Sequence, residues 1–596
     1  MKKFLLLVFL TYANFSFAQS LPIFLDGRTN DWNEPVPTYI DNAGDGNQFD
    51  FRYFSVTNDE LFLFIRLNLT PEMKLLENNQ LTLYIDGDNN SETGVLINGI
   101  GAELEWNFGD RNGTFYKNGN FNITHPDILY RSLPTVTDTT YEIAIGRVVL
   151  PNGIDSLFTS STIKIFFEDK ASNGDWMPNS GEVFEYTFDN TPTPPLVPID
   201  INRYDTTLLR VMDYNVLQDG LLDPNREEYF ARILQAIQPD IICFNEFFGS
   251  SAAQVKNKIN QILPLPNGAS WNAVKLDQGN VTVSRYPFIQ SWEVYPGHRI
   301  TASLVDLPSY YNSDIMVINS HYKCCGGTTN DEKRQKEADA TIAFILDAKT
   351  PGGAIDLPEN TPFVILGDLN LVRNRQQQTT LITGEIINTQ LFGNGAPPDW
   401  DDTDLQDLLA SQTDRRTAYT WRDDGSSFPP GRLDYQICSN SVMSVEKAFL
   451  IQTEVMSPDR LAEYGFQQND TKNASDHFPN VTDYSFSVTS VTEGNNQPEG
   501  FKLEQNYPNP FNPSTKIKFS IPESPLSGGD GRGGLQLIKL VVYDLLGNEV
   551  ATLVNKELPA GNYEIEFNAS NLPSGVYFYQ LTAGSFIQTK KMILIR

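Results

Sequence analysis

Polar residues that could bind a metal ion or move a proton follow several apolar runs in the middle of the chain. These runs end in amides, carboxylates and an imidazole, namely Asn215, Glu246, His321 and Asp368. Each run is rich in β-branched residues, which is typical of a strand. Side chains at the same edge of several strands can converge on one pocket. One such ending would mean little, but several in one region predict a shared site.

The residue types favour a hard cation at this site. Asn215, Glu246 and Asp476 offer oxygen ligands, which suit Mg²⁺, with Mn²⁺ as the alternative. The clustered Cys and His residues typical of zinc are absent from the sequence. A metal bound to a phosphoryl oxygen neutralises the charge that develops there during attack. We therefore expect hydrolysis of a phosphoric ester.

Two of the four histidines, His321 and His477, lie within this pattern. In Ser475-Asp476-His477 a carboxylate stands beside the imidazole, and Asp434, in a separate strand-like run, could orient the ring. A histidine paired with a carboxylate can remove a proton from water near neutral pH. The pattern predicts an acid–base pair beside the metal.

The composition of the chain limits the kinds of partner that it can bind. The chain of 596 residues carries a net charge of −30, which repels polyanions at long range and disfavours tight, sequence-independent binding of DNA. A nuclease is still compatible with this charge, because what matters for cutting is the charge local to a metal site. Four cysteines are too few for a disulfide scaffold, and the sequence leaves their pairing open.

The first residues are typical of an export signal. A charged start, an apolar run, and the small residues Ser16 and Ala18 predict a signal peptide over residues 1–18. The apolar run is far shorter than the ~20 residues that a membrane-spanning helix needs. We therefore expect the signal peptide to be cut after Ala18 and the protein to be exported.

Two shifts in composition divide the remaining chain. A proline-rich stretch at 190–204 and a small, polar stretch at 488–500 are typical of linkers. Residues 19–189 alternate in hydrophobicity between turns, which predicts an all-β sandwich. Residues 205–487 mix strands with a helical pattern after Asp223 and Pro224, which predicts an α/β or α+β domain. Residues 501–596 return to strands and predict a second, smaller β-sandwich.

The middle region resembles the endonuclease/exonuclease/phosphatase superfamily, which includes the DNase I-like nucleases, sphingomyelinases and inositol-phosphate phosphatases. The landmarks occur in family order: Asn215 in DYNVL, Glu246 in QPDIICFNE, Ser284 and Arg285 in GNVTVSRYP, His321 in NSHY, Asp368 and Asn370 in GDLN, Asp434 in RLDY, and Asp476 with His477 in SDHFP. The resemblance implies a multidomain chain. Its catalytic domain would be an α+β four-layer sandwich of the DNase I-like type, flanked by two all-β sandwich domains.

The same resemblance implies how the metal and the base are arranged. Glu246 would bind Mg²⁺, with Asn215 and Asp476 completing or supporting the metal site. His477, oriented by Asp434, would activate water or stabilise the transition state.

The remaining landmarks would act on the nucleophile and on the phosphate. Asp368 would orient the nucleophile, and whether Asp368 or His477 is the base stays open. Asn370 would hold the scissile phosphate, and His321 would donate a hydrogen bond to a phosphate oxygen.

Positive charge gathers near these motifs in the otherwise acidic chain. The cations are Lys323, Lys333, Arg334, Lys336, Arg373 and Arg375. They could meet the flanking phosphates of a nucleic acid or form a solvated face balanced by neighbouring acids. Tyr310 and Tyr311 could touch a membrane, as in lipid-acting relatives, or simply pack a hairpin.

Three functions are compatible with these features. An extracellular nuclease acting on phosphodiester bonds of nucleic acid is the first hypothesis. A lipid or small-molecule phosphoesterase, sphingomyelinase-like or inositol-phosphate phosphatase-like, is the second. A catalytically inactive binding protein of the cell surface is the third, and the intact set of polar residues opposes it.

The N-terminal region carries an acidic motif of its own. The run from Asp86 to Gly94 could hold a structural Ca²⁺ or form a plain acidic turn. Together with the opening run 25–32, the region resembles the family 9 carbohydrate-binding and DOMON-like sandwiches. This resemblance implies binding of a glycan, with a passive spacer as the alternative.

The tail resembles the C-terminal sorting domain of the type IX secretion system. The matching segments are 501–515, 542–553, 574–579 and 590–592. The resemblance implies export through the periplasm and outer membrane, with the tail recognised by the secretion machinery; whether the tail is then cleaved stays open. Residues 525–534 form an insertion that should be flexible. We expect the mature protein to be monomeric.

Overall fold

The computed structural model describes residues 20–32, 36–486 and, with gaps at 504, 507–508, 510, 512, 523–535, 546, 559–560, 570–571 and 584–585, residues 501–595. The predicted signal peptide, the second linker and the insertion at 525–534 lie outside the described residues. Within the described part, no helix is long and apolar enough to cross a membrane. The chain divides into two compact units, Met1–Thr489 and Ser490–Arg596.

The N-terminal region consists of two antiparallel sheets. The first has the order β1-β2-β3-β11-β10, with strands Thr38–Ile40, Asp50–Asn58, Phe62–Met73, Asp138–Gly146 and Arg131–Leu133. The second has the order β13-β12-β4-β7-β8-β9, with β14 also paired to β12; its strands are Trp176–Met177, Thr162–Asp169, Leu81–Asp86, Leu104–Asn107, Asn112–Tyr116, Asn120–Ile123 and Phe184–Thr187. A short hairpin, β5 and β6, spans Val95–Ile97 and Ile100–Ala102. The sheets are consistent with the all-β region predicted from the alternating pattern, and both contribute to one core.

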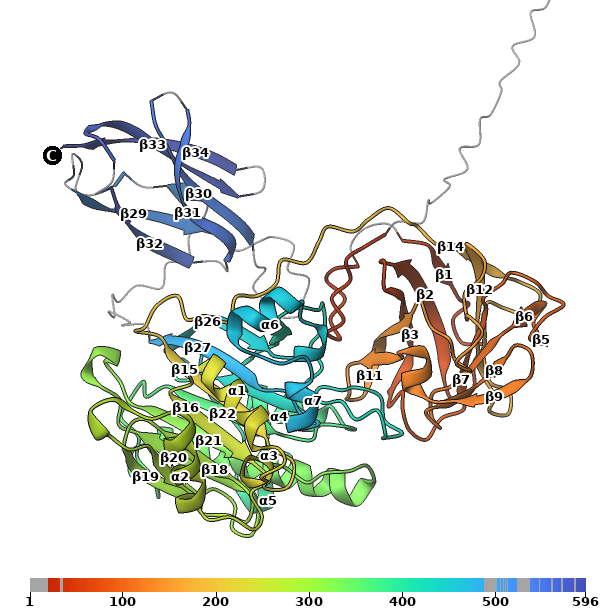
Figure 1. The fold of residues 1–596 in the computed structure, drawn as a ribbon, viewed down its shortest axis with the longest axis horizontal. Helices are drawn as coiled ribbons and strands as arrows, with labels where there is room; N and C mark the ends of the chain where they lie inside the picture. Colours follow the sequence, from red (N-terminus) through yellow and green to blue (C-terminus); the bar gives the residue numbers. More distant parts are fainter. Residues whose placement is uncertain are drawn as a thin grey trace, which may run out of the picture. The chain divides into compact units, whose positions relative to one another are not determined.

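The middle region contains two further mixed sheets. One has the order β17-β18-β16-β15-β27-β26-β24, with strands Asn272–Val274, Val281–Ser284, Ile241–Asn245, Leu209–Asn215, Asn480–Phe486, Met443–Leu450 and Ser411–Gln412. The other has the order β19-β20-β21-β22-β25-β23, with strands Phe288–Glu293, Ile300–Val305, Ile315–Ser320, Phe363–Asp368, Asp434–Cys438 and Gln406–Asp407. Figure 1 shows these sheets together with the helices of the region.

Apolar side chains on both faces of these sheets explain the layers. Val211 of β15 and Val317 of β21 belong to one buried core formed by both sheets. The opposite face of the first sheet packs against helices α1 and α2, Glu227–Ile237 and Ala252–Ile262. The opposite face of the second sheet packs against α3, Thr328–Lys349, and α4, Gln376–Thr383. Strands buried on both sides must be apolar at successive positions, which is why these runs lack alternation.

Shorter helices complete the middle region: α5, Thr389–Phe392; α6, Pro458–Tyr464; and α7, Asp470–Ala474. Helix α1 begins at Glu227, later than the signal at Asp223 and Pro224 predicts. The Asp223 carbonyl accepts hydrogen bonds from the amides of Arg226 and Glu227, so these residues form a turn that precedes the helix.

Pairing of the strands brings the predicted site residues to one edge. Strands β15 and β16 run parallel, so Asn215 lies opposite Asn245, next to Glu246. In the other sheet β22 and β25 run antiparallel, with Asp368 opposite Asp434. The end of each strand thus places a polar group at the same rim of the two sheets.

The N-terminal sandwich packs directly on loops of the middle region, within the same compact unit. The amide of Leu25 donates to the Arg416 carbonyl, and the amide of Ala418 donates back to Leu25, both at 3.1 Å. The Thr137 amide donates to the Arg373 carbonyl at 2.6 Å. These contacts hold the segments that lead out of and into the strands bearing Asp368 and Asp434.

The C-terminal unit is a small β-sandwich. A three-stranded sheet, β28-β29-β32, comprises Lys502–Leu503, Ser514–Ile521 and Gly561–Asn568. A four-stranded sheet, β31-β30-β33-β34, comprises Glu549–Leu558, Gln536–Tyr543, Gly575–Ala583 and Phe586–Leu594. Buried side chains from both sheets, among them Phe519 and Tyr579, form its core.

Candidate active site

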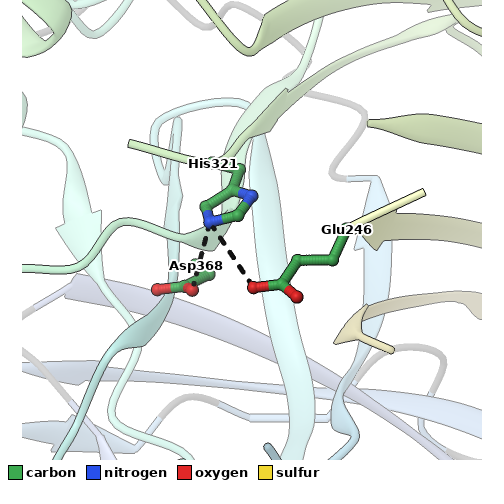
Figure 2. Close-up of side chains that lie close together, drawn as sticks. All are labelled: Glu246, His321 and Asp368. Atoms are coloured by element: carbon green, nitrogen blue, oxygen red, sulfur yellow. Dashed lines mark ion pairs between the residues drawn. The ribbon is translucent and has the colours of Figure 1, made fainter. Parts of the chain in front are cut away.

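Three side chains from three strand ends form a group of the size needed to bind a metal. Glu246 follows β16, His321 follows β21 and Asp368 ends β22. The His321 Nε2 atom lies 4.0 Å from Glu246 Oε1 and 3.6 Å from Asp368 Oδ2 (Figure 2). One ligand atom from each residue lies within 4.8 Å of the other two. The φ angle of Glu246 is +70°, an uncommon conformation that clusters at ligand sites.

Asn215 links two of these carboxylates. Its Nδ2 atom donates to Glu246 Oε1 at 3.2 Å and to Asp368 Oδ2 at 3.0 Å. Its side-chain oxygen accepts the amide of Leu217 at 3.0 Å, and Glu246 Oε2 accepts the amide of Gln218, also at 3.0 Å. The loop after β15 therefore holds both Asn215 and Glu246 in place.

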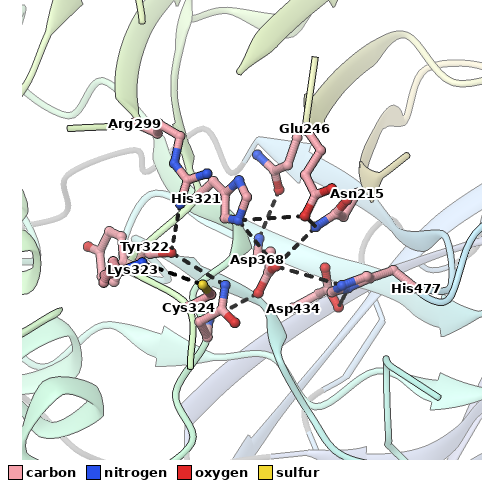
Figure 3. A network of polar contacts seen from close by, with 12 residues as sticks. Asn215, Glu246, Arg299, His321, Tyr322, Lys323, Cys324, Asp368, Asp434 and His477 are labelled. Carbon is pink, nitrogen blue, oxygen red and sulfur yellow. Dashed lines mark hydrogen bonds and ion pairs between the residues drawn. The ribbon is translucent and has the colours of Figure 1, made fainter. Parts of the chain in front are cut away.

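A second group, made by Asp368, Asp434 and His477, shares a carboxylate with the first. Asp434 Oδ2 and His477 Nδ1 form a hydrogen bond of 2.8 Å, and His477 Nε2 lies 3.7 Å from Asp368 Oδ2. Figure 3 shows both groups in one network. Asp368 thus belongs to the group of three side chains that could bind a metal, and it also lies beside the acid–base pair of Asp434 and His477.

Charge and burial shift the pKa values of this network. Burial raises the pKa of Asp368 to about 7; the charge of His477 opposes this rise, while Asp434 and Glu246 add to it. Burial disfavours the charged form of His477, but the attraction of Asp434 and Asp368 outweighs burial and raises its pKa to about 10. Burial, reinforced by the charge of Arg299, lowers the pKa of His321 well below its usual value.

The donor set fits a divalent cation. Carboxylate oxygens predominate, and the nitrogen donors within the two described groups are those of His321 and His477. Two buried atoms in this network, His321 Nδ1 and Asp434 Oδ1, lack a hydrogen-bond partner in the described part of the chain. Clustered carboxylates repel one another unless a cation offsets their charge. Oxygen ligands of this kind are those that Mg²⁺ and Mn²⁺ prefer.

Asn370 reaches the same network. Its amide donates to Asp368 Oδ1 at 3.1 Å, and its Nδ2 atom donates to the Tyr322 carbonyl at 3.4 Å. Its φ angle is +50°, which Asn tolerates better than most residues. The side chain is therefore held beside the residue that follows His321.

Asp476 lies differently from the other predicted residues. Its Oδ2 atom accepts a hydrogen bond from Trp421 Nε1 at 2.9 Å. The neighbouring Ser475 hydroxyl donates to the carbonyl of Asn215 at 2.8 Å, which ties this segment to β15. Among the described residues, Asp476 belongs to neither of the two metal-sized groups above.

Sequence reasoning missed a buried amide at the centre of the site. Asn245 Oδ1 accepts the amide of Asp368 at 2.9 Å, and Asn245 Nδ2 donates to Asn280 and to Asn319, both at 2.9 Å. All three asparagine side chains are completely buried. Their positions within apolar strands or at strand ends are the signal that could have revealed them, because a buried amide must find partners.

A glycine allows this close approach. Gly367 has a φ of +123°, and a Cβ at this position would meet the Ser320 carbonyl oxygen at 2.2 Å and Asn245 Oδ1 at 3.0 Å. Gly367 directly precedes Asp368, so the close contact between backbones places the carboxylate.

A buried acid was also missed. Asp213, on β15, accepts a hydrogen bond from Gln436 Nε2 at 2.9 Å through Oδ2. Burial, together with the repulsion of Asp434, raises its pKa well above the usual value. A polar residue at an inward position of an apolar strand is again the signal. Asp213 therefore adds a buried carboxyl group close enough to Asp434 for the two to interact electrostatically.

Other residues highlighted from the sequence lie elsewhere or have structural partners. Ser284 pairs with Ile241 at the start of β16, opposite the end that carries Glu246, and Arg285 lies 3.4 Å from Asp240. Tyr311 is buried in the core between the two sheets, whereas Tyr310 is exposed.

The arginines near the motifs are likewise engaged. Arg334 is buried and pairs with Asp331. Arg373 lies 3.2 Å from Asp331, and Arg375 pairs with Asp138 of the N-terminal sandwich. These contacts favour a structural role for the three arginines.

Two family models match the chain. Residues 214–477 match the Endonuclease/Exonuclease/phosphatase family, and residues 505–595 match the secretion system C-terminal sorting domain. No curated protein matches the sequence.

Several solved structures are similar to the chain. An endonuclease/exonuclease/phosphatase from Beutenbergia cavernae is 15% identical, with 65% of this chain and 100% of that chain covered and a TM-score of 0.30. An AP endonuclease from Leishmania major is 13% identical, with 49% and 93% covered and a TM-score of 0.30. An AP endonuclease from Archaeoglobus fulgidus is 12% identical, with 47% and 100% covered and a TM-score of 0.29.

The two family matches confirm the predicted enzyme class and localisation. The first identifies the middle region as a metal-dependent phosphoric ester hydrolase. The second marks the chain as one exported by type IX secretion to the cell surface or the extracellular space, and implies an interaction with that machinery.

Proposed function

We propose that the chain is an exported nuclease that hydrolyses phosphodiester bonds with Mg²⁺. One observation supports this most strongly. The Asp368 carboxylate belongs to the group of side chains that could bind a metal, and it also lies beside the Asp434–His477 pair. A phosphodiester needs both functions at one point, because attack by water requires a base and the phosphoryl oxygens require charge neutralisation. The proposed catalytic domain is a DNase I-like four-layer sandwich.

Glu246 would hold the metal, with Asn215 supporting it through the hydrogen bond between their side chains. Asp476 would act from the adjacent segment, where Trp421 fixes its carboxylate. Bound Mg²⁺ would supply positive charge at a phosphoryl oxygen. Mn²⁺ has the same preference for oxygen ligands and should substitute for it.

Asp434 fixes the imidazole of His477 through Nδ1, so that Nε2 faces Asp368. We assign the base jointly to His477 and Asp368. Because the pKa of about 10 leaves His477 protonated near neutral pH, the proton of the attacking water would pass to the Asp368 carboxylate, beside the imidazolium. The neutral ring of His321 would donate to a phosphate oxygen through Nε2, and Asn370 would hold the scissile phosphate with Nδ2. These roles of His321 and Asn370 are supported by the position of both residues beside the Asp368 carboxylate.

The substrate is tested directly with the purified full-length chain. DNA, RNA, sphingomyelin, an inositol phosphate and a bis-aryl phosphodiester are each incubated with Mg²⁺, with Mn²⁺ or with EDTA. We expect cleavage of nucleic acid that EDTA abolishes. Cleavage of sphingomyelin or the inositol phosphate alone would replace the nuclease proposal with the lipid or small-molecule one, and no turnover of any substrate would favour a binding protein.

Two variants make the metal assignment specific. Glu246→Ala should lose most activity and require more Mg²⁺ for what remains, because it removes a carboxylate from the metal-sized group. Glu359→Ala, at an exposed loop position, is the matched control and should behave as the wild type. Equal Mg²⁺ requirements in both variants would contradict the assignment.

A structural Ca²⁺ in the N-terminal sandwich is the second part of the proposal. Ligand atoms of Asp86, Asp88 and Glu103 lie within 4.8 Å of one another, which adds a residue that sequence reasoning missed. Asp86 Oδ2 and Glu103 Oε1 are buried without a hydrogen-bond partner in the described part, although Lys164 lies 3.6 Å from Asp86. Ca²⁺ should raise the melting temperature of the wild type and not of Glu103→Gln.

Glycan binding by the N-terminal sandwich and a monomeric state stay predictions. Affinity electrophoresis in polysaccharide gels tests the first, because bound protein is retarded. Size-exclusion chromatography with light scattering tests the second.

A further inference from the structure

We propose that Cys324 and Cys325 form a disulfide between neighbouring residues in the exported protein. Their Sγ atoms lie 2.8 Å apart, well inside the separation at which two unbonded sulfur atoms come into contact. Cys325 has a φ of +75°, an uncommon conformation for a residue with a side chain. The backbone thus turns the two thiols toward each other.

The other cysteines are not available to this pair. Cys243 and Cys438 are completely buried in the core between the two sheets of the middle region. Cys324 is half-buried and Cys325 is exposed, so an oxidant in solvent can reach them. An exported protein enters a compartment in which thiols of this kind become oxidised.

Oxidation requires an external disulfide, such as oxidised glutathione or a dithiol oxidase. The Cys325 thiolate would attack this disulfide and release one thiol, which leaves Cys325 in a mixed disulfide. The Cys324 thiolate would then attack the Cys325 sulfur and release the second thiol. Two protein thiols are oxidised and one external disulfide is reduced to two thiols. Lys323 Nζ lies 3.6 Å from Cys324 Sγ, the sulfur that closes the ring.

The small ring closed by the Cys324–Cys325 disulfide would fix the loop that connects the active site to α3. At the start of this loop, the Tyr322 amide donates to the Asp368 carbonyl at 3.0 Å. Arg334, on α3, donates to the carbonyls of Lys323 and Cys325, both at 2.8 Å. The cysteine pair spans the stretch between these anchors, as Figure 3 shows for the beginning of the loop. We assign the disulfide a positioning role for this loop.

Counting thiols tests the disulfide directly. The full-length protein is exposed to oxidised glutathione, denatured and titrated with a thiol reagent. We expect two reactive thiols before reduction and four after it, and two in both states for the Cys324→Ser/Cys325→Ser variant. The tryptic peptide from Cys324 to Lys333 should be lighter than its reduced form by two hydrogen atoms. Four thiols in the oxidised wild type, or glutathione bound to Cys325, would overturn the proposal.

Limited proteolysis tests the positioning role. Trypsin should cut after Lys323 several-fold faster in the reduced wild type than in the oxidised one. The double serine variant should be cut at one rate with or without reductant. If reduction leaves the cleavage rate of the wild type unchanged, the disulfide does not position the loop. Neither readout uses catalytic activity, so failure of the proposed function would leave this test intact.

Discussion

The side-chain oxygen of Asn245 accepts the backbone amide of Asp368 at 2.9 Å. Asn245 ends a strand of one sheet and Asp368 ends a strand of the other, so this bond joins the two sheets at the rim of the active site. It fixes the spacing between Glu246, the next residue after Asn245, and the Asp368 carboxylate. The geometry of the site therefore depends on an amide that belongs to neither of the two groups that could bind a metal.

Asn245→Leu should lower both stability and activity. The leucine removes the acceptor of the buried Asp368 amide and the donor to the side-chain oxygens of Asn280 and Asn319, which costs about 1–3 kcal/mol for each unsatisfied group. Urea denaturation measures the first effect and turnover of a diester measures the second. Asn257→Leu, on the exposed side of α2, is the control. Unchanged stability of Asn245→Leu would show that the bond between the sheets contributes nothing.

Gly367→Ala should be more damaging than an alanine at another glycine with positive φ. The new Cβ would meet the Ser320 carbonyl oxygen at 2.2 Å in addition to the conformational strain, and we expect a loss of more than about 3 kcal/mol. Gly352 has a φ of +85° with open space around it, so Gly352→Ala isolates the strain alone, about 1–2 kcal/mol. Equal melting temperatures for the two variants would refute the close approach.

Asp434→Asn and His477→Ala should each reduce turnover by about 10²–10⁴-fold, since positioned acid–base groups contribute on this scale. The double variant should be little worse than His477→Ala, because the two side chains act as one unit through their 2.8 Å hydrogen bond. His298→Ala changes a half-exposed histidine paired with Glu337 and serves as the control. Multiplicative losses in the double variant would mean that the two residues act separately.

Stability without metal should fall as the pH rises from about 4 to about 7. Burial raises the pKa of Asp368 from 3.8 to about 7, so the folded chain holds this proton more tightly than the unfolded chain does. The stabilisation is complete below the unfolded pKa and is lost as the pH rises through the folded pKa. Thermal melts in EDTA across this range test the trend. It should be shallower in Asp368→Asn but still present, because burial also raises the pKa of Asp41 to about 7 and that of Glu142 to about 8.

Mg²⁺ should reverse this trend, because the ion favours the ionised carboxylates. The increase in melting temperature on adding Mg²⁺ should therefore be larger at pH 8 than at pH 5. An increase that does not depend on pH would indicate that the ion binds away from Asp368.

The strand endings could be predicted from the sequence because local pattern controls them. An apolar, β-branched run that stops at Asp368 or Glu246 indicates where a strand ends, and the ends of neighbouring strands share an edge. The pairing of Asp368 with Asp434 could not be predicted, since antiparallel partners far apart in the chain leave no local signal. The family resemblance placed both residues among the landmarks of one site, but the structure was needed to show that they pair.

The partners of individual side chains were the least predictable part. Asp476 was expected at the metal, but whether its carboxylate faces the metal or Trp421 depends on a residue distant in sequence. Asn245 was overlooked because the sequence alone does not distinguish a buried asparagine from an asparagine in a turn. Glu103 was overlooked because it reaches the Asp86 motif only through the pairing of β4 with β7.

The bridge between Leu25 and the segment from Arg416 to Ala418 has a consequence for the order of folding. Leu25 finds these partners only after most of the middle region has been synthesised. Contacts between residues so far apart in the chain form slowly, because a large loop must close first. Until then the backbone amide and carbonyl of Leu25 lack these partners, and unpaired backbone groups in an extended segment invite association between chains. A truncated product that ends before Arg416 should therefore aggregate even though its own sandwich is complete.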